Sequence, residues 1–512
     1  MRSLAAISGA LCVSVALVVA LPQEKLATER RRTDNAGLYL LSRRENEGLA
    51  SKITQAEASG ANPEAACAAA QAALGETIVQ TQPLIQTDVE NNWSQTCIAE
   101  PRCIFQPASA SDVGKLVQIL DDHQVKFAVR SGGHSPNPGW SSIGDAGVLF
   151  DMSAMSTISL SEDGKVVSVG PGARWGQVST AADSKGVTVV GGREPAIGVG
   201  GLTLGGGNFY LTSEFGLAAD NVKNFEAVLA DGTIINANAD ENSDLFWSLK
   251  GGGPSFGIVT RYDLSTVPVY DLWYAAYLYT PDQALELLDA MAQWQKGGAS
   301  DLRSSVVFSI GLDSALVLMT YSAQAESPAA FGPFYQIKPL TIAIPPTNDT
   351  VRSLHDPTSS GFAPTPGRHD YRAVSSQVDA QLYKDVYEFW LVEATAVHEA
   401  TGANQTFVIQ HVSRNVAQQG VGWTSLVDGL DEEDDELARS VSITTTARWR
   451  ELSQERGLDI DFLYMNDASR DQSPLASYGE ENVQKLKDVA LKYDPTQLFQ
   501  NLLNGRFLLS KL

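Results

Sequence analysis

The chain has 512 residues, of which 43% are hydrophobic and 19% charged, and its 37 basic and 60 acidic residues give a formal net charge of −23. Its length leaves room for about two to four domains, and its composition is that of a folded protein rather than a disordered one. The negative charge argues against nucleic acid as the main partner, because phosphate binding requires clustered lysine and arginine, so a neutral or polar small molecule is expected.

The first twenty residues predict a cleaved signal peptide, because Arg2 is followed by an apolar run over residues 4–20 that ends in small residues. A membrane anchor is the alternative, but the run is short for a bilayer and no basic cluster follows it directly. No other stretch reaches the ~20 apolar residues of a membrane helix, so a secreted or secretory-pathway protein without a membrane segment is expected. Residues 21–60 are polar, and we interpret them as a leader.

Three cysteines remain after the signal peptide, which predicts one disulfide and one free thiol in an oxidising compartment. The expected pair is Cys67 with Cys103, and three unpaired cysteines are the alternative. No spacing of cysteine and histidine matches a metal site, so no metal is expected. Sequons predict glycosylation at Asn92, Asn348 and Asn404.

From Cys103 onward, short elements alternate regularly along the chain. Ser109 precedes a predicted helix with an apolar face, and residues 127–129 form a predicted strand that ends at a glycine loop. Further strands are predicted at residues 148–150, 166–169, 187–190 and 225–229, the last followed by a hairpin turn at Asp231-Gly232. Strand, helix, strand and glycine loop in this order are typical of nucleotide binding.

After residue 269 the glycine content falls, and we predict a domain boundary there. Residues 270–455 are expected to form an α+β domain with a helix around 281–295 and strands at 304–311 and 315–322. The acidic run at 431–436 is predicted to be a solvent-exposed loop. Residues 456–512 form a C-terminal segment with a helix over 478–493.

Two glycine-rich loops, Arg130-Ser-Gly-Gly-His-Ser135 and Gly198-Val-Gly-Gly-Leu-Thr203, suit an anionic ligand, because amides without side chains nearby can approach a diphosphate. A tight turn is the alternative for the first loop. The phosphate loop of ATP and GTP hydrolases is absent, and Thr203 stands where the Rossmann fingerprint requires its third glycine. A dinucleotide would therefore be held by another fold.

In their order along the chain, these loops and later motifs resemble the berberine-bridge-enzyme-like FAD-linked oxidoreductases of the vanillyl-alcohol-oxidase superfamily, in particular their fungal members. The later motifs are Asp220-Asn-Val222, Lys250-Gly-Gly-Gly253, Phe256-Gly-Ile-Val259, Tyr464-Met-Asn466 and Lys492-Tyr-Asp-Pro495. The resemblance implies an α+β, two-lobed fold. A PCMH-type FAD-binding lobe covers residues 98–269, an antiparallel-sheet substrate lobe with helices covers 270–455, and residues 456–512 return to the first lobe.

The resemblance also implies FAD as the cofactor, bonded covalently through its 8α-methyl to His134, whose neutral imidazole is a competent nucleophile. Some relatives carry a second covalent bond to FAD, from a cysteine directly before the proline that precedes the second loop, which is Pro195 in this chain. Glu194 stands at that position, so a single bond is predicted. The other residues implied to hold FAD are Arg130, Ser131, Gly132, Gly133, Ser135, Gly198, Gly200, Gly201, Ile258, Val259 and Asn466.

Relatives often have a tyrosine base directly after Asn466, where this chain has Asp467, so Tyr464 and Asp467 are both candidate catalytic bases. The implied function is a secreted oxidase of secondary metabolism that takes hydride from a hydroxylated or phenolic small molecule and reduces O2 to H2O2. One alternative is a carbohydrate oxidase in which Trp273, Trp390 and Trp423 stack on sugar rings, although these could equally be core residues. The other is a flavin-bearing isomerase or cyclase without net redox change.

Overall fold

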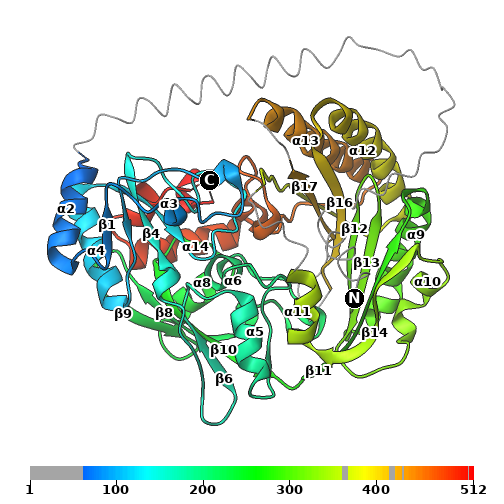
Figure 1. Cartoon of the computed structure of the whole chain (residues 1–512), viewed down its shortest axis with the longest axis horizontal. Helices are drawn as coiled ribbons and strands as arrows, with labels where there is room; N and C mark the ends of the chain where they lie inside the picture. Colours follow the sequence, from blue (N-terminus) through cyan, green and yellow to red (C-terminus); the bar gives the residue numbers. More distant parts are fainter. Residues whose placement is uncertain (1–60, 360–366, 414–420, 429–431, 506) are drawn as a thin grey trace.

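The computed structural model describes residues 61–359, 367–413, 421–428, 432–505 and 507–512. The signal peptide and leader predicted for residues 1–60 lie outside them. The described chain forms two lobes side by side (Figure 1). The first carries a four-stranded and a six-stranded sheet, and the second is built on one eight-stranded sheet, so the predicted two-lobed α+β fold is confirmed. Within these residues, we find no helix that is both long and apolar enough to cross a membrane.

The four-stranded sheet has the order β1-β2-β4-β3, with parallel pairing of β2 to β4 and of β3 to β4. Helix α4 (Ala110–His123) connects β2 to β3 and begins where the Ser109 side chain accepts a hydrogen bond from Asp112 N. Its apolar face is buried, as the spacing predicts. The strands are β1 (Val79–Thr81), β2 (Cys103–Phe105), β3 (Lys126–Arg130) and β4 (Gly147–Asp151).

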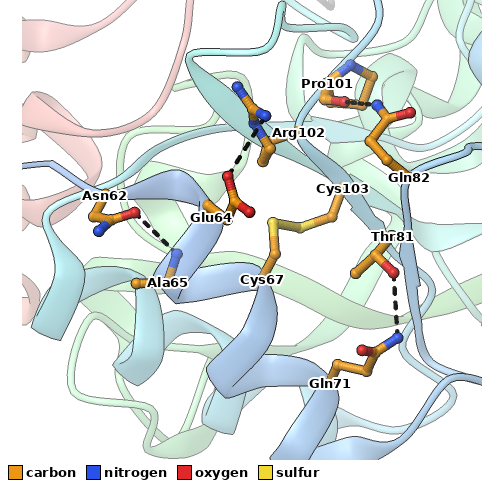
Figure 2. The surroundings of a disulfide bond; sticks show 10 residues. All are labelled: Asn62, Glu64, Ala65, Cys67, Gln71, Thr81, Gln82, Pro101, Arg102 and Cys103. Atoms are coloured by element: carbon orange, nitrogen blue, oxygen red, sulfur yellow. Dashed lines mark hydrogen bonds and ion pairs between the residues drawn. A yellow bond between two sulfur atoms is a disulfide. The ribbon is translucent and has the colours of Figure 1, made fainter.

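Helix α2 (Pro63–Leu74) is joined to β2 by a disulfide between Cys67 and Cys103 (Figure 2). Both cysteines are buried, while Cys97 is a buried free thiol. Gln71 Nε2 also donates a hydrogen bond to Thr81 Oγ1 at 3.3 Å, so the helix is held to the sheet by covalent and polar contacts. The pair and the free thiol are those expected from the sequence.

The six-stranded sheet has the order β5-β6-β10-β8-β9, with β7 paired to β10. Strands β8 and β9 form the hairpin predicted at Asp231-Gly232, and Gly232 has φ +82°, a conformation that favours glycine. Short helices α5 (Trp175–Asp183), α6 (Val199–Leu204) and α8 (Ser243–Leu249) pack on this part of the lobe. The strands are β5 (Ile158–Leu160), β6 (Val166–Val169), β7 (Thr188–Val189), β8 (Val222–Val228), β9 (Ile234–Asn238) and β10 (Ile258–Val267).

The second lobe begins at β11, and the boundary predicted near residue 269 lies between β10 and β11, which belong to different sheets. Its sheet is antiparallel throughout, in the order β14-β11-β13-β12-β16-β17-β15-β18. Helices α9 (Ala284–Lys296), α12 (Ala380–Thr401) and α13 (Glu432–Glu455) cover one face (Figure 1). The strands are β11 (Asp271–Tyr279), β12 (Ser304–Ile310), β13 (Ala315–Tyr321), β14 (Thr341–Thr350), β15 (Ala373–Ser376), β16 (Asn404–His411), β17 (Val421–Asp428) and β18 (Asp459–Ile460).

Side chains along β12 and β13 point alternately to the two faces of this sheet, and both faces are apolar. Phe308 and Val317 belong to the core beneath the helices. Val307, Leu316 and Leu318 point to the other face, because neighbouring side chains of a strand lie on opposite sides. That other face is turned toward the first lobe (Figure 1).

The acidic run at 431–436 is not the loop that we predicted, because helix α13 begins at Glu432. Acidic side chains are favourable in the first turn of a helix, where they interact with the positive end of its dipole. Asp435 also accepts a hydrogen bond from Arg368 Nε at 2.7 Å. From Glu432 onward, the acidic residues therefore form the start of α13.

The C-terminal segment returns to the first lobe, as the sequence predicts (Figure 1). Helix α14 (Glu480–Tyr493) packs against α8, and Lys492 Nζ and Tyr493 Oη both bond to the carboxylate of Asp244, at 2.5 and 2.7 Å. Beyond it, Phe127 N of β3 donates to Leu502 O at 3.0 Å. These contacts bring the Tyr464-Met-Asn466 motif next to the glycine loops.

Candidate active site

A cavity of about 510 Å³ lies between the two lobes, a size typical of small-molecule sites. Both glycine loops, strand β10 and the 464–467 segment form its walls, together with side chains from the second lobe. All residues implied to hold FAD except Arg130 line it, together with both candidate bases. These are Ser131, Gly132, Gly133, His134, Ser135, Gly198, Gly200, Gly201, Ile258, Val259, Tyr464, Asn466 and Asp467.

The two glycine loops touch each other. A Cβ on Gly132 would lie 2.4 Å from Gly198 N, so a side chain there would push the loops apart. Ser131 Oγ ties them together, because it donates to Pro171 O at 2.5 Å and accepts from Gly200 N at 3.1 Å. The glycines therefore serve close packing of the loops as well as access to a ligand.

The first loop also presents backbone donors. Over the part of the chain that the structure describes, the amides of Gly132 and Gly133 donate no hydrogen bond to another protein group. Buried amides are almost always bonded, so these two are suited to an anionic ligand. A cofactor diphosphate fits this loop.

His134 lines the cavity at the end of this loop, and its imidazole stacks on the indole of Trp93 with ring centroids 4.2 Å apart. Burial, and then the nearby His369, lower the pKa of His134 to about 3. The imidazole is therefore neutral at physiological pH, which is the nucleophilic form.

Arg130 does not hold the ligand through its side chain, which corrects our prediction. Its guanidinium is fully buried and lies 2.7 Å from Asp151 Oδ2 of the neighbouring strand β4. Val129 faces the cavity, and alternation along β3 turns Arg130 to the opposite face. The arginine stabilises the sheet beneath the loop.

Tyr464 connects the C-terminal segment to the turn that follows α6. Its Oη accepts hydrogen bonds from Gly207 N at 3.0 Å, Asn208 N at 2.8 Å and Asn466 Nδ2 at 3.0 Å. Burial, and then the charge of Asp467, raise the pKa of Tyr464 to about 12. The phenol is therefore protonated near neutral pH, with three donors directed at its oxygen.

Asp467 belongs to a polar group that joins the lobes. Its Oδ2 accepts a hydrogen bond from Gln410 Nε2 of β16. Gln410 Oε1 in turn accepts from Asn208 Nδ2 at 3.1 Å and from Arg193 Nη2 at 2.5 Å. Sequence analysis missed Arg193, Asn208 and Gln410, because no local pattern distinguishes them from other polar residues.

Glu194 lines the same cavity with little polar support. Ala196 N donates to its Oε1 at 3.5 Å, and no ion pair joins it to a cation of the described chain. The adjacent Arg193 is directed at Gln410 instead. Burial raises the pKa of Glu194 from 4.5 to about 8, so an uncharged carboxylic acid faces the cavity at pH 7.

The second lobe contributes two kinds of side chain to the cavity: Val307, Leu316 and Leu318 form an aliphatic wall, and Tyr371 adds one aromatic ring. Trp273 and Trp390, two of the three tryptophans considered for sugar stacking, are instead fully buried in the core under the helices. The side chain of Trp423 lies outside the described residues. The strands of the second lobe thus present aliphatic side chains to the cavity, whereas a sugar site would require more aromatic platforms and hydrogen-bonding groups than Tyr371 provides.

The predicted modification and metal sites have separate outcomes. Asn92 is only 4% exposed and its Oδ1 accepts a hydrogen bond from Ser141 Oγ at 2.9 Å, so the folded chain has no room for a glycan there and this prediction is wrong. Asn348 is exposed and Asn404 is half-buried. Among the described residues, no three His, Cys, Asp or Glu side chains are grouped to hold a metal ion.

Comparison with known proteins agrees with this geometry. Residues 101–238 match the model of an FAD binding domain. The chain is 36% identical over 434 residues to an FAD-dependent monooxygenase of Arthrobotrys oligospora, covering 82% of this chain and 84% of the relative. It is 31% identical to a bifunctional solanapyrone synthase of Alternaria solani, covering 81% of this chain and 82% of that relative.

Among solved structures, the chain is similar to a glucooligosaccharide oxidase from Acremonium strictum, with a TM-score of 0.74 at 20% identity. The match covers 86% of this chain and 99% of that one, and that enzyme is described as carrying a 6-S-cysteinyl, 8α-N1-histidyl FAD. At this identity, the likeness concerns the fold.

Proposed function

The chain belongs to the berberine-bridge-enzyme-like family of FAD-linked oxidoreductases, and we propose that it oxidises an apolar, hydroxylated or phenolic small molecule in secondary metabolism. One observation carries this proposal. A single cavity joins the glycine loops, which suit the FAD diphosphate, to the polar group around Asp467 and to the aliphatic wall of the second lobe.

Bound in this cavity, FAD would supply the redox chemistry, namely hydride acceptance from the substrate carbon and reoxidation by O2 with release of H2O2. The neutral imidazole of His134 and its place in the cavity wall support a covalent bond to the cofactor. Glu194 cannot form a thioether, so His134 is proposed as the single attachment. The histidyl link of the Acremonium strictum enzyme is consistent with this assignment.

Asp467 is the proposed base that accepts the substrate proton. Burial, and then the charge of Asp467, raise the pKa of Tyr464 to about 12, so its phenol already holds its proton near neutral pH and is not available to accept another. A carboxylate offers about four acceptor positions. Asp467 also stands where relatives often carry the catalytic tyrosine. In this assignment, Tyr464 fixes the geometry and Asp467 takes the proton.

The substrate class follows from the distribution of polar and apolar side chains around the cavity. Polar groups gather around Asp467, and Val307, Leu316 and Leu318 line the wall contributed by the second lobe. A substrate with one hydroxyl on an apolar ring or chain satisfies both parts, whereas a sugar would leave hydroxyls against aliphatic side chains, which is unfavourable. This supports a natural-product intermediate over a carbohydrate.

Oxygen consumption and peroxide release on panels of phenols, apolar alcohols and oligosaccharides test the proposal, with Asp467→Asn as the inactive control. Turnover of apolar phenols or alcohols with stoichiometric H2O2 is expected. Several relatives are named monooxygenases, so the same reactions under ¹⁸O2 must be analysed by mass spectrometry. Label in the product would refute the oxidase assignment, peroxide from sugars alone would favour a carbohydrate oxidase, and product without oxygen uptake would favour an isomerase or cyclase.

Secretion is proposed as well. The disulfide between Cys67 and Cys103 and the exposed sequon at Asn348 are consistent with an oxidising, glycosylating compartment. Recovery of the full chain from the culture medium of a fungal host, with a mass decrease on glycosidase treatment, is expected. An unglycosylated intracellular product would contradict this proposal.

A further inference from the structure

Two histidines from different lobes stack on one indole ring. His134 lies 4.2 Å from Trp93, with 10° between the ring planes, and His369 lies 3.7 Å from Trp93, with 5° between the planes. These distances are close to ring-to-ring contact, and parallel aromatic stacking is favourable. Trp93 itself does not line the cavity, so it supports His134 from behind.

The segment that carries Trp93 is fixed to the first glycine loop. Trp93 N donates to Gly133 O at 2.9 Å, directly before His134 in the chain. The side chain of Asn92 is buried and bonded to Ser141, as described above. The backbone bond of Trp93 and the buried side chain of Asn92 therefore fix the position of the indole relative to the loop.

The second lobe reaches this segment through residues 367–369. Gln95 N donates to Gly367 O at 2.7 Å, and His369 N donates to Ser94 Oγ at 3.0 Å. Tyr371, two residues further along the chain, lines the cavity. Docking of the second lobe thus places His369 on the indole at the same time as it forms a cavity wall.

We propose that Trp93 and His369 are positioning residues for the covalent attachment of FAD to His134. The proposal rests on the attachment proposed above. Attachment replaces one C–H bond of the 8α-methyl and one imidazole N–H bond by a C–N bond, and O2 accepts the two electrons and two protons as H2O2. The stack restricts rotation of the imidazole about its side-chain bonds, so its nucleophilic nitrogen stays directed into the cavity. Efficient attachment then requires both lobes to be docked.

The test measures attachment directly. Full-length wild type, Trp93→Ala, Trp93→Phe, His369→Ala and His369→Phe are purified and incubated with added FAD. Total bound flavin is read from absorbance, and the covalent share from flavin fluorescence of the denatured chain over time. Trp247→Ala is the matched control, because Trp247 lies on α8 outside the cavity and its ring makes a cation–π contact with Lys485 Nζ.

The alanine variants at 93 and 369 are expected to attach FAD about three- to tenfold more slowly than wild type, the size of one aromatic pair. The phenylalanine variants keep a ring and should restore most of the rate, while total bound flavin changes little. Wild-type rates in both alanine variants would overturn the proposal. If Trp93→Ala does not fold, the comparison of His369→Ala with His369→Phe decides the question. A wild type without covalent flavin would instead refute attachment at His134 itself, and with it this inference.

Discussion

The hydroxyl oxygen of Tyr464 lies 2.8 Å from the backbone nitrogen of Asn208, which joins the C-terminal segment to the turn after the second glycine loop. Gly207 N and Asn466 Nδ2 donate to the same oxygen. Tyr464→Phe leaves these three donors without their acceptor, and an unsatisfied buried donor costs ~1–3 kcal/mol. We expect a lower Tm with part of the activity kept. Full loss of activity at an unchanged Tm would identify Tyr464 as the base instead.

Asp467→Asn should reduce kcat by about 10²–10⁴, the usual contribution of a general base, because the amide cannot accept the substrate proton. Covalent flavin and Tm are expected to stay close to wild type. Steady-state kinetics and the denatured-chain fluorescence check both. Asp461→Asn, an exposed residue of the same segment, serves as control. Wild-type turnover in Asp467→Asn would remove it from the catalytic role.

Glu194 predicts a pH dependence of stability. Its pKa is about 8 in the folded chain against an ordinary 4.5, so above pH 4.5 the unfolded chain is ionised while the folded chain still holds the proton. Stability therefore falls as pH rises from about 4.5 to about 8 and levels off beyond. Glu194→Gln lacks this contribution, so its Tm should exceed that of wild type by an amount that grows across this window. A difference in Tm that is constant with pH would contradict a protonated Glu194.

His134→Ala should abolish covalent attachment while FAD can still bind. After acid precipitation, flavin should stay in the wild-type pellet and appear in the supernatant of the variant. The absorbance of both fractions gives the measurement. Yellow colour released from wild type would exclude the covalent bond.

Arg130→Leu tests the corrected role of this arginine. The change removes the direct ion-pair partner of the buried Asp151, because the two side chains are 0% and 2% exposed and lie 2.7 Å apart. Loss of one partner of such a pair costs about 3–5 kcal/mol. Urea unfolding should show this loss, while the flavin spectrum of the folded fraction remains unchanged. An unaffected stability with weakened FAD binding would restore the ligand-binding interpretation.

Local patterns carried much of the fold. The helix after Ser109, the hairpin at Asp231-Gly232 and the C-terminal helix all follow from residues within one element, and each is found where the sequence placed it. The acidic run at 431–436 was assigned wrongly, because its charge pattern suits an exposed loop and a helix start equally. The glycosylation predicted at Asn92 was wrong for a related reason, since a sequon is a three-residue pattern that contains no information about burial.

By itself, the sequence determined the ligand class and the lobe that binds it. A loop that binds a diphosphate depends on its backbone conformation and on the absence of side chains, and the positions of glycine in the sequence show both. The tertiary structure alone decided which groups face the cavity. It turned Arg130 toward Asp151, brought Gln410 to Asp467 and set His369 on Trp93. The pairing of β3 with β4 brings Arg130 to Asp151, whereas the other two pairs form only when the two lobes pack together.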